Sequence, residues 1–314
     1  MGTKKCTRLW MRTSGRQGPA QVRWNAALPI LALIWLALVV GLELVEPTPT
    51  HARPHITAAD RARILVIAHR GASSVAPENT IPAMLAATKA HTNMVEFDVQ
   101  RTSDGHLIVV HDSTFARTTN VARAFPRRVF DPVGSFTLGQ VRRLDAGSWM
   151  APRFTGTRVP TLRRLLAVMR PTRTNLLLEL KNPDLYPGYE AQVARALRRT
   201  GYIRAHRVYV HSFSISALML LHKDAPTVPL GLLTHQGISA ATGRSGLRTV
   251  NPTANTVTGA GVDHARAEHL QVFAWPAHGL QVTEAQVDHL VEDGVTGIIT
   301  NNPAAIRRDI LEGS

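Results

Sequence analysis

The sequence contains very little cysteine, few aromatic residues and few lysines. Of its 314 residues one is cysteine, 5% are aromatic, and only five of the 36 basic side chains are lysine. A single cysteine excludes disulfide bonds within the chain and a zinc-finger spacing of ligands. The net charge of +14 invites a nucleic-acid interpretation, but the arginines are scattered, with no basic run interleaved with aromatics. Because base stacking needs such aromatics, we exclude nucleic-acid binding as the main function.

The absence of charge from one N-terminal stretch predicts a targeting segment. Residues 26–42 carry no charged side chain, six basic residues and no acid precede them, and a Pro/Thr-rich stretch follows. Positive charge ahead of an apolar run predicts export of the remainder. We expect residues 1–52 to be a signal peptide, with Thr50-His51-Ala52 as its cleavage site, or an uncleaved anchor that contacts the membrane. Residues 53–63 would be a linker, and the exported part, secreted or membrane-anchored, has no cysteine.

Beyond residue 63 one pattern recurs: a short apolar run, a loop and a helical segment. Helices are expected over residues 80–90, after the capping residue Thr161, after the capping box that begins at Thr283, and from Pro303 onward. Continuous apolar strands that alternate with helices are typical of parallel sheets covered on both faces. The sequence therefore predicts an α/β fold, a TIM (β/α)8 barrel over residues 64–314, rather than a doubly wound sheet with a G-x-G-x-x-G turn. The expected strands are residues 64–68, 94–99, 176–180, 208–210, 230–233, 249–250, 272–275 and 297–300.

Polar side chains interrupt three of these apolar runs, always near the carboxyl end. The first run leads into His-Arg-Gly, the second holds two acids two residues apart, and the third holds an acid and a lysine two residues apart. Strand residues two apart share a face, and the carboxyl ends of barrel strands form the active-site face. Singly, each could be a structural histidine, a solvated edge or an ion pair, but their joint placement favours a site. The residues are His69, Arg70, Glu96, Asp98, Glu179 and Lys181.

The hairpin after the second strand adds another histidine. Asp104-Gly105 is a strong signal for a two-residue turn, and that register places Asp98 opposite His111. Three carboxylates in one pocket repel one another unless they are protonated or bind a cation, and oxygen ligands favour Mg²⁺ or Ca²⁺ over zinc. Two histidines beside a cation, with arginine and lysine to hold a phosphate, indicate cleavage of a phosphate ester.

The order of these motifs resembles the glycerophosphodiester phosphodiesterase family. HRG, PENT, EFDV, DG, VVHD and RTT follow one another, and LELKN, VHSF, VFAW and IITNNP continue the similarity to about residue 303. The resemblance implies a TIM barrel with a small insertion after the hairpin of the second strand, here at about residues 113–160. It also implies a phosphoric diester hydrolase that converts glycerophosphodiesters to glycerol 3-phosphate and an alcohol.

The resemblance assigns a catalytic role to five residues. His69 and His111 match the acid–base pair of the family; their order stays open, with His69 favoured as the base. Glu96, Asp98 and Glu179 match the ligands of one divalent cation, Mg²⁺ or Ca²⁺.

Substrate contacts follow from the same resemblance. Arg70 and Lys181 match positions that contact the phosphate, Trp275 matches a tryptophan near the substrate alcohol, and Glu78 of the PENT motif helps to shape the site. Two segments depart from the family: its W-T-V-N is WPAH here, and its IITD-type ending is IITN, with Asn301 in place of the acid.

Several alternatives remain open. The same barrel type serves enzymes that act on lysophospholipids, in the manner of a lysophospholipase D, or on polymeric glycerophosphates such as teichoic acids. A non-catalytic surface binding protein is a third hypothesis, and nucleic-acid phosphodiesters rank last. The expected partner is a small glycerophosphodiester derived from lipid or envelope polymer, and the basic charge of the exported part favours anionic polymers or lipids.

Overall fold

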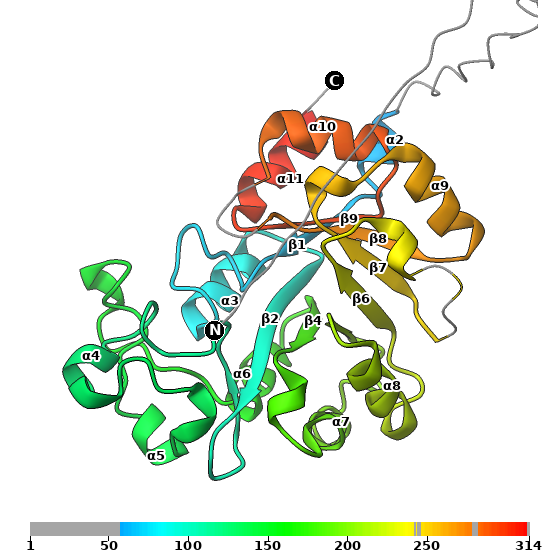
Figure 1. Cartoon of the computed structure of the whole chain (residues 1–314). Helices are drawn as coiled ribbons and strands as arrows, with labels where there is room; N and C mark the ends of the chain where they lie inside the picture. The colour runs from blue at the N-terminus through cyan, green and yellow to red at the C-terminus, as the bar shows by residue number, and fades with distance from the viewer. Residues whose placement is uncertain (1–56, 242, 244–245, 278–281, 313–314) are drawn as a thin grey trace, which may run out of the picture. The chain divides into compact units, whose positions relative to one another are not determined.

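The computed structural model describes residues 57–241, 243, 246–277 and 282–312 (Figure 1). The expected signal segment, residues 1–52, lies outside the described residues, as do the first four residues of the expected linker. Among the helices of the described part, none is long and apolar enough to cross a membrane.

Eight parallel strands close into a barrel, which confirms the predicted TIM-type fold. Strand β1 pairs with β2 on one side and with β9 on the other, and this double pairing closes the sheet. All eight predicted strands form. They are β1 Leu65–Ala68, β2 Met94–Arg101, β4 Asn175–Leu180, β5 Val208–Ser212, β6 Leu230–Thr234, β7 Thr249–Pro252, β8 Gln271–Ala274 and β9 Gly297–Thr300.

The two-residue period of the strands separates an inner layer from an outer one. In β2 the outward residues Val95, Phe97 and Val99 join the large cluster under the helices, whereas Met94 joins a separate cluster inside the barrel. Because Glu96 follows Met94 at the period of two, the acids of β2 also face inward, above an apolar floor. That floor consists of Ile67, Met94, Leu177, Phe273 and Ile299.

Helices cover the outside of the barrel (Figure 1). The expected start signals operate: the Thr161 side chain accepts a hydrogen bond from the Arg164 amide, and Thr283 forms a capping box with Gln286. Helix α6 buries the face that carries Leu162 and Met169. The covering helices are α3 Ile81–Lys89, α6 Leu162–Met169, α7 Tyr189–Arg199, α8 Ile215–Asp224, α9 Gly259–Ala267, α10 Glu284–Glu292 and α11 Pro303–Glu312.

Residues 113–160 form a small lobe with its own apolar cluster, in the place of the expected insertion. The lobe contains α4 Val121–Ala124, α5 Leu138–Val141 and short 3₁₀ turns, with no strand among its described residues. Phe115 and Phe136 pack edge to face in its core, with ring centroids 5.2 Å apart.

The segment expected as a linker contains a docked helical turn. Helix α2 (Ala58–Arg61) begins with a capping box between Thr57 and Asp60. Arg61 then makes an ion pair of 3.0 Å with Asp288 on α10, which fixes this turn against the barrel.

The hairpin between β2 and β3 (Leu107–Val109) has a different register from the one predicted. Val99 pairs with Val109, and the Val110 amide donates to the carbonyl of Asp98, so Asp98 lies opposite Val110 rather than His111. The loop has three residues and ends at Gly105, whose φ of 81° is in the left-handed region. The Asp104 side chain accepts a hydrogen bond from the Leu138 amide of the lobe, and this tertiary contact favours the longer loop.

Candidate active site

A pocket of about 630 Å³ opens at the carboxyl ends of the strands. Eight of the nine predicted site residues line it. The ninth, Asp98, is 1% exposed and makes contacts with residues of the lining. The strand-end argument therefore brings together every residue that it singled out. The lining members of the set are His69, Arg70, Glu78, Glu96, His111, Glu179, Lys181 and Trp275.

The three buried acids of β2 and β4 carry unequal proton affinities. Burial, together with the charges of Asp98 and Glu179, raises the pKa of Glu96 well above its usual range. Burial and the charge of Asp98 raise the pKa of Glu179 to about 8, against the opposing effect of Lys181. Burial alone would also raise the pKa of Asp98, but the neighbouring cations and Asn79 hold it well below its ordinary value. Near neutral pH the cluster therefore retains at least one proton, which a bound cation would displace.

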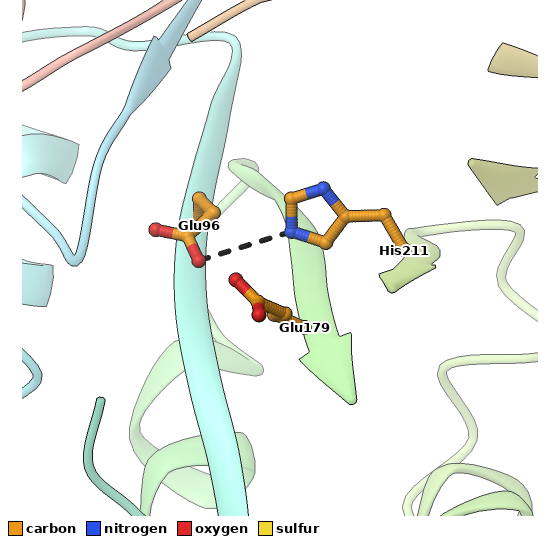
Figure 2. Close-up of side chains that lie close together, drawn as sticks. All are labelled: Glu96, Glu179 and His211. Carbon is orange, nitrogen blue, oxygen red and sulfur yellow. Dashed lines mark ion pairs between the residues drawn. The ribbon is translucent and has the colours of Figure 1, made fainter. Parts of the chain in front are cut away.

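A histidine that the sequence argument did not select completes a possible metal site. His211, at the end of β5, lies with Glu96 and Glu179 so that one potential ligand atom from each falls within 4.8 Å of the others (Figure 2). The His211 Nε2 atom is 3.8 Å from Glu96 Oε1 and is buried with no hydrogen-bond partner in the described part of the chain. Burial lowers the pKa of His211 to about 3, so the ring is neutral and suited to bind a metal.

Asp98 is held by groups other than the Glu96–Glu179–His211 cluster. Asn79 donates from Nδ2 to Asp98 Oδ2 at 2.8 Å and accepts from the Asp98 amide at 3.1 Å. The other carboxylate oxygen is 3.9 Å from Lys181 Nζ. Asn79 itself adopts a left-handed conformation with φ of 59°. Its position inside the PENT motif was the signal that could have identified it.

His69 follows β1 and is oriented from behind by Asn301. The His69 Nδ1 and Asn301 Oδ1 atoms are 2.6 Å apart, so Nδ1 carries the proton and donates, which leaves Nε2 as the basic nitrogen. Burial, reinforced by the Arg70 charge, lowers the pKa of His69 to about 3. The departure from the family's acidic ending therefore lies in direct contact with a predicted catalytic histidine.

His111 is held by a carboxylate instead. Its Nδ1 is 2.8 Å from Asp112 Oδ1, and Arg117 binds that carboxylate through two nitrogens. Arg117 also binds both oxygens of Glu78, and Glu78 in turn accepts from Arg70 at 2.9 Å. The four charged groups form a chain from one side of the pocket to His111. Sequence reasoning named Glu78 but missed Asp112 and Arg117, which stand in the VVHD and RTT motifs.

The two predicted phosphate contacts follow β1 and β4, the strands that pair with β2 on its two sides. Arg70 has a φ of 54°, and its backbone amide donates to Glu96 Oε2 at 2.7 Å. Lys181 donates to Glu179 Oε1 at 2.9 Å. Gly71 allows the close approach of α3, because a Cβ there would lie 2.6 Å from the Ala83 carbonyl carbon. The HRG motif is thus needed for backbone shape as well as for chemistry.

Three rings form an aromatic wall on the remaining side. Phe213 stacks on His235 with centroids 4.8 Å apart, and Trp275 meets both rings edge-on. Trp275 is fixed by a 2.9 Å hydrogen bond from Nε1 to the Asn251 carbonyl. Of these residues only Trp275 was predicted, because Phe213 and His235 follow strands whose apolar runs carried no acid.

Comparisons with known proteins agree with this geometry. The family model for the glycerophosphoryl diester phosphodiesterase family matches residues 69–305. The chain belongs to this family. A glycerophosphodiester phosphodiesterase of Bacillus subtilis is 33% identical over 292 residues, which cover 87% of this chain and 95% of that protein. One from Caldanaerobacter subterraneus is 32% identical over 256 residues, covering 80% and 99%. The prediction of a phosphoric diester hydrolase of this family is confirmed.

Solved structures extend the agreement to the fold. A glycerophosphodiester phosphodiesterase from Agrobacterium tumefaciens superposes with a TM-score of 0.64 at 27% identity, over 80% of this chain and all of that one. An Oleispira antarctica phosphodiesterase, solved with the product sn-glycerol-3-phosphate, has a TM-score of 0.67 at 23% identity, over 78% and 96%. The barrel fold is therefore shared with solved chains that differ from this one at most positions.

Proposed function

We propose that this protein hydrolyses glycerophosphodiesters to glycerol 3-phosphate and an alcohol, with one divalent cation and two histidines. One observation supports the proposal above all. Two histidines with different hydrogen-bond partners line the same pocket as the buried acids and the basic side chains of Arg70 and Lys181. His69 has an amide behind it and a low pKa, whereas His111 has a carboxylate behind it. Acid–base catalysis requires such a difference between its two members.

The buried residues fit a divalent cation. Glu96, Glu179 and His211 would hold it, with Asp98 as the further ligand that family resemblance suggests. Asn251 Oδ1 is buried without a partner in the described structure, and Asn251 Nδ2 faces His211 Nδ1 at 3.0 Å. If the Asn251 carboxamide is rotated by half a turn, its Oδ1 accepts a hydrogen bond from the His211 Nδ1–H group. The lone pair of His211 Nε2 then points toward the two glutamates. The cation, Mg²⁺ or Ca²⁺, supplies positive charge for the phosphoryl oxygens.

The chain's own residues supply the proton transfers. His69 Nε2 accepts the proton of the attacking hydroxyl, and the bond from phosphorus to the leaving alcohol breaks. Attack by water gives glycerol 3-phosphate directly. Attack by the glycerol 2-hydroxyl gives a cyclic glycerol phosphate, which water then opens with the two histidines in exchanged roles. His111 donates a proton to the leaving alcohol, and the Asp112 carboxylate, 2.8 Å from His111 Nδ1, orients the ring. Arg70 and Lys181 hold the phosphate, and the buried Arg70 Nε makes no hydrogen bond among the described residues, although it lies 3.6 Å from Asp98 Oδ2.

Turnover of purified protein tests the proposal. Glycerol 3-phosphate release from glycerophosphocholine is measured with Mg²⁺, with Ca²⁺ and with chelator. We expect His69→Ala and His111→Ala each to lower the rate about 10²–10⁴-fold. His264→Ala, at an exposed histidine on α9, is the matched control and should be unchanged. Full activity of either pocket variant, or in chelator, would refute the mechanism.

The metal assignment has its own test. Glu96→Gln with Asp98→Asn should abolish activity and also the rise in thermal midpoint that cation addition gives the wild type. His211→Gln keeps a neutral polar group and should weaken cation affinity about 10- to 100-fold. Unchanged cation affinity in this variant would remove His211 from the ligand set.

A second candidate function uses the same chemistry on a larger leaving group. The aromatic wall of Phe213, His235 and Trp275 is suited to an apolar or bulky alcohol portion, as in a lysophospholipid or a polymeric glycerophosphate. Comparing release of choline, lysolipid and polymer-derived glycerol phosphate separates the candidates. Phe213→Ala should reduce the rate on the bulkier substrates more than on glycerophosphocholine.

We also propose that the catalytic barrel is exported. The support is the basic stretch followed by the uncharged run of residues 26–42. Cell fractionation with N-terminal sequencing of the mature protein distinguishes a signal peptide cleaved after Ala52 from an uncleaved anchor. Recovery of the full chain in the cytoplasm would refute export.

A further inference from the structure

A second cavity, of about 410 Å³, lies on the flank of the barrel away from the catalytic pocket. The tip of the β2–β3 hairpin forms one wall, the start of α6 another, and α7 a third. No residue that lines it also lines the catalytic pocket. The proposed hydrolysis therefore leaves this cavity without a role.

Four arginines line the cavity, which we call the arginine groove: Arg142, Arg163, Arg195 and Arg199. They come from the residue after α5, from α6 and from α7, so the fold brings together positions far apart in the sequence. No acidic side chain lines the groove. In the described part of the chain, the guanidinium groups of these four arginines make no ion pair with a carboxylate and no hydrogen bond.

Two further features make the groove electropositive. Arg195 and Arg199 are four residues apart on one helix, a spacing at which like charges repel and destabilise the helix. Thr161 and Leu162 also line the groove, so the amino-terminal turn of α6, the positive end of its dipole, faces the same space. One acid, Asp104, lies beside the groove without lining it: its Oδ1 accepts from Thr102 and from the Leu138 amide and is 3.4 Å from His106 Nδ1, so one negative charge stands against the four arginines.

An anion with several charges along its length would relieve this repulsion. Guanidinium groups bind phosphate oxygens through paired hydrogen bonds, and four of them match a chain of phosphodiesters better than one isolated phosphate. A flat membrane would contact protruding side chains, whereas here the arginines surround a hollow. Among the lining residues the only ring is the imidazole of His106, too little for the row of stacking rings that nucleic-acid bases need.

We propose that the arginine groove binds a polyol-phosphate polymer, a chain of phosphodiesters without aromatic bases. Bound there, the polymer is held by contacts that do not involve the catalytic residues. Binding and turnover are thus separate properties, and each can fail without the other. The proposal depends on the charges of the groove and not on the proposed hydrolysis.

Binding of a labelled synthetic oligo(glycerol phosphate) to the full chain tests this proposal. Chelator is present throughout, so that no turnover occurs, and the affinity is measured over a series of salt concentrations. The test variant is Arg195→Gln with Arg199→Gln. The matched control is Arg123→Gln with Arg127→Gln, which removes two exposed arginines of the lobe that do not line the groove. The basic N-terminal segment is identical in all of these proteins, so its contribution cancels.

We expect the groove variant to bind at least about tenfold more weakly, with a salt dependence less steep by about two phosphate contacts, while the control binds like the wild type. Thermal unfolding should show the groove variant to be at least as stable as the wild type, because the repulsion between the two arginines is removed. Its turnover of glycerophosphocholine should be unchanged. Equal weakening in both variants would refute a specific groove. Wild-type binding to anionic phospholipid vesicles but not to the oligomer would assign the charges to a membrane surface instead. Equally tight binding of single-stranded DNA would also overturn the proposal.

Discussion

Replacing Asn301 by aspartate should raise the pKa of the histidine proposed as the catalytic base. Asn301 Oδ1 is 2.6 Å from His69 Nδ1, so the substitution puts a carboxylate in the same place without a change in side-chain size. The pKa of His69 is about 3 because burial and the Arg70 charge disfavour the protonated ring. A negative charge behind the ring stabilises that protonated form and opposes both effects.

The size of the shift follows from the geometry. Two unit charges about 4 Å apart in an environment of effective dielectric constant about 20 interact by about 4 kcal/mol, or about 3 pKa units. The new carboxylate is partly desolvated, and the amide oxygen already accepts the hydrogen bond, so the net shift is smaller, about 2 units. The pKa of His69 in the variant is then about 5.

The pH dependence of kcat/KM measures this shift, because a base must be neutral to act. The activity of the variant should fall as the pH drops through about 5, whereas the wild type should keep its activity to about 3. Asn302→Asp is the matched control: it adds the same charge one residue later, where the side chain caps α11. If the acidic limb of the kcat/KM profile is the same in Asn301→Asp and in the wild type, His69 is not the base. If the alkaline limb moves instead, His69 is the acid.

Three other predictions concern the carboxylates Asp112, Glu179 and Asp145. Asp112→Asn should lower kcat about 10- to 100-fold, since the His111 ring loses the carboxylate that orients it at 2.8 Å; an unchanged kcat would argue against the proposed role of His111. Cation affinity, measured by calorimetry, should rise with pH until about 8, with proton release, because Glu179 must ionise to bind metal; affinity independent of pH would contradict this. Asp145→Ala should destabilise the fold by about 2 kcal/mol in chemical denaturation, because Asp145 accepts from the amides of Gly147, Ser148 and Gly156. The folded-state pKa of Asp145 is lowered, so this difference should be present above about pH 4 and should shrink in more acidic solution.

The strand-end residues could be predicted because topology alone brings them together. Parallel strands that alternate with helices present their carboxyl ends at one face, whatever the intervening sequence is. His69 and Glu179 stand at such ends, and Glu96, although early in β2, lies level with the end of β1 because Ala68 pairs with Val95. Their convergence therefore required no knowledge of loop structure. The same argument explains why the eight strands and the Thr161 cap could be recognised: each depends on local pattern and burial.

The features that escaped prediction depend on contacts between distant segments. The hairpin register was wrong by one residue because Asp104 binds the Leu138 amide, a contact 34 positions away that the turn sequence does not encode. His211 was not selected, since the apolar run of residues 208–210 that it follows carries no acid. Only the pairing of β5 with β4, which aligns His211 with Glu179, distinguishes it.

The apolar floor of the barrel and the acid cluster above it act together on the affinity of the acids for protons and cations. Met94 and Glu96 lie on the same face of β2, and Leu177 and Glu179 on the same face of β4, so each acid stands directly above an apolar side chain. The apolar side chains beneath Glu96 and Glu179 exclude water from the carboxylates. Because the charged form is then disfavoured, the pKa values of both acids are raised. A single buried cation removes the proton and the mutual repulsion together, and no exposed cluster of acids would gain as much from binding it. Leu177→Asn makes the floor more polar and should therefore lower the pKa of Glu179. Cation binding should then depend less on pH, even though residue 177 touches neither substrate nor metal.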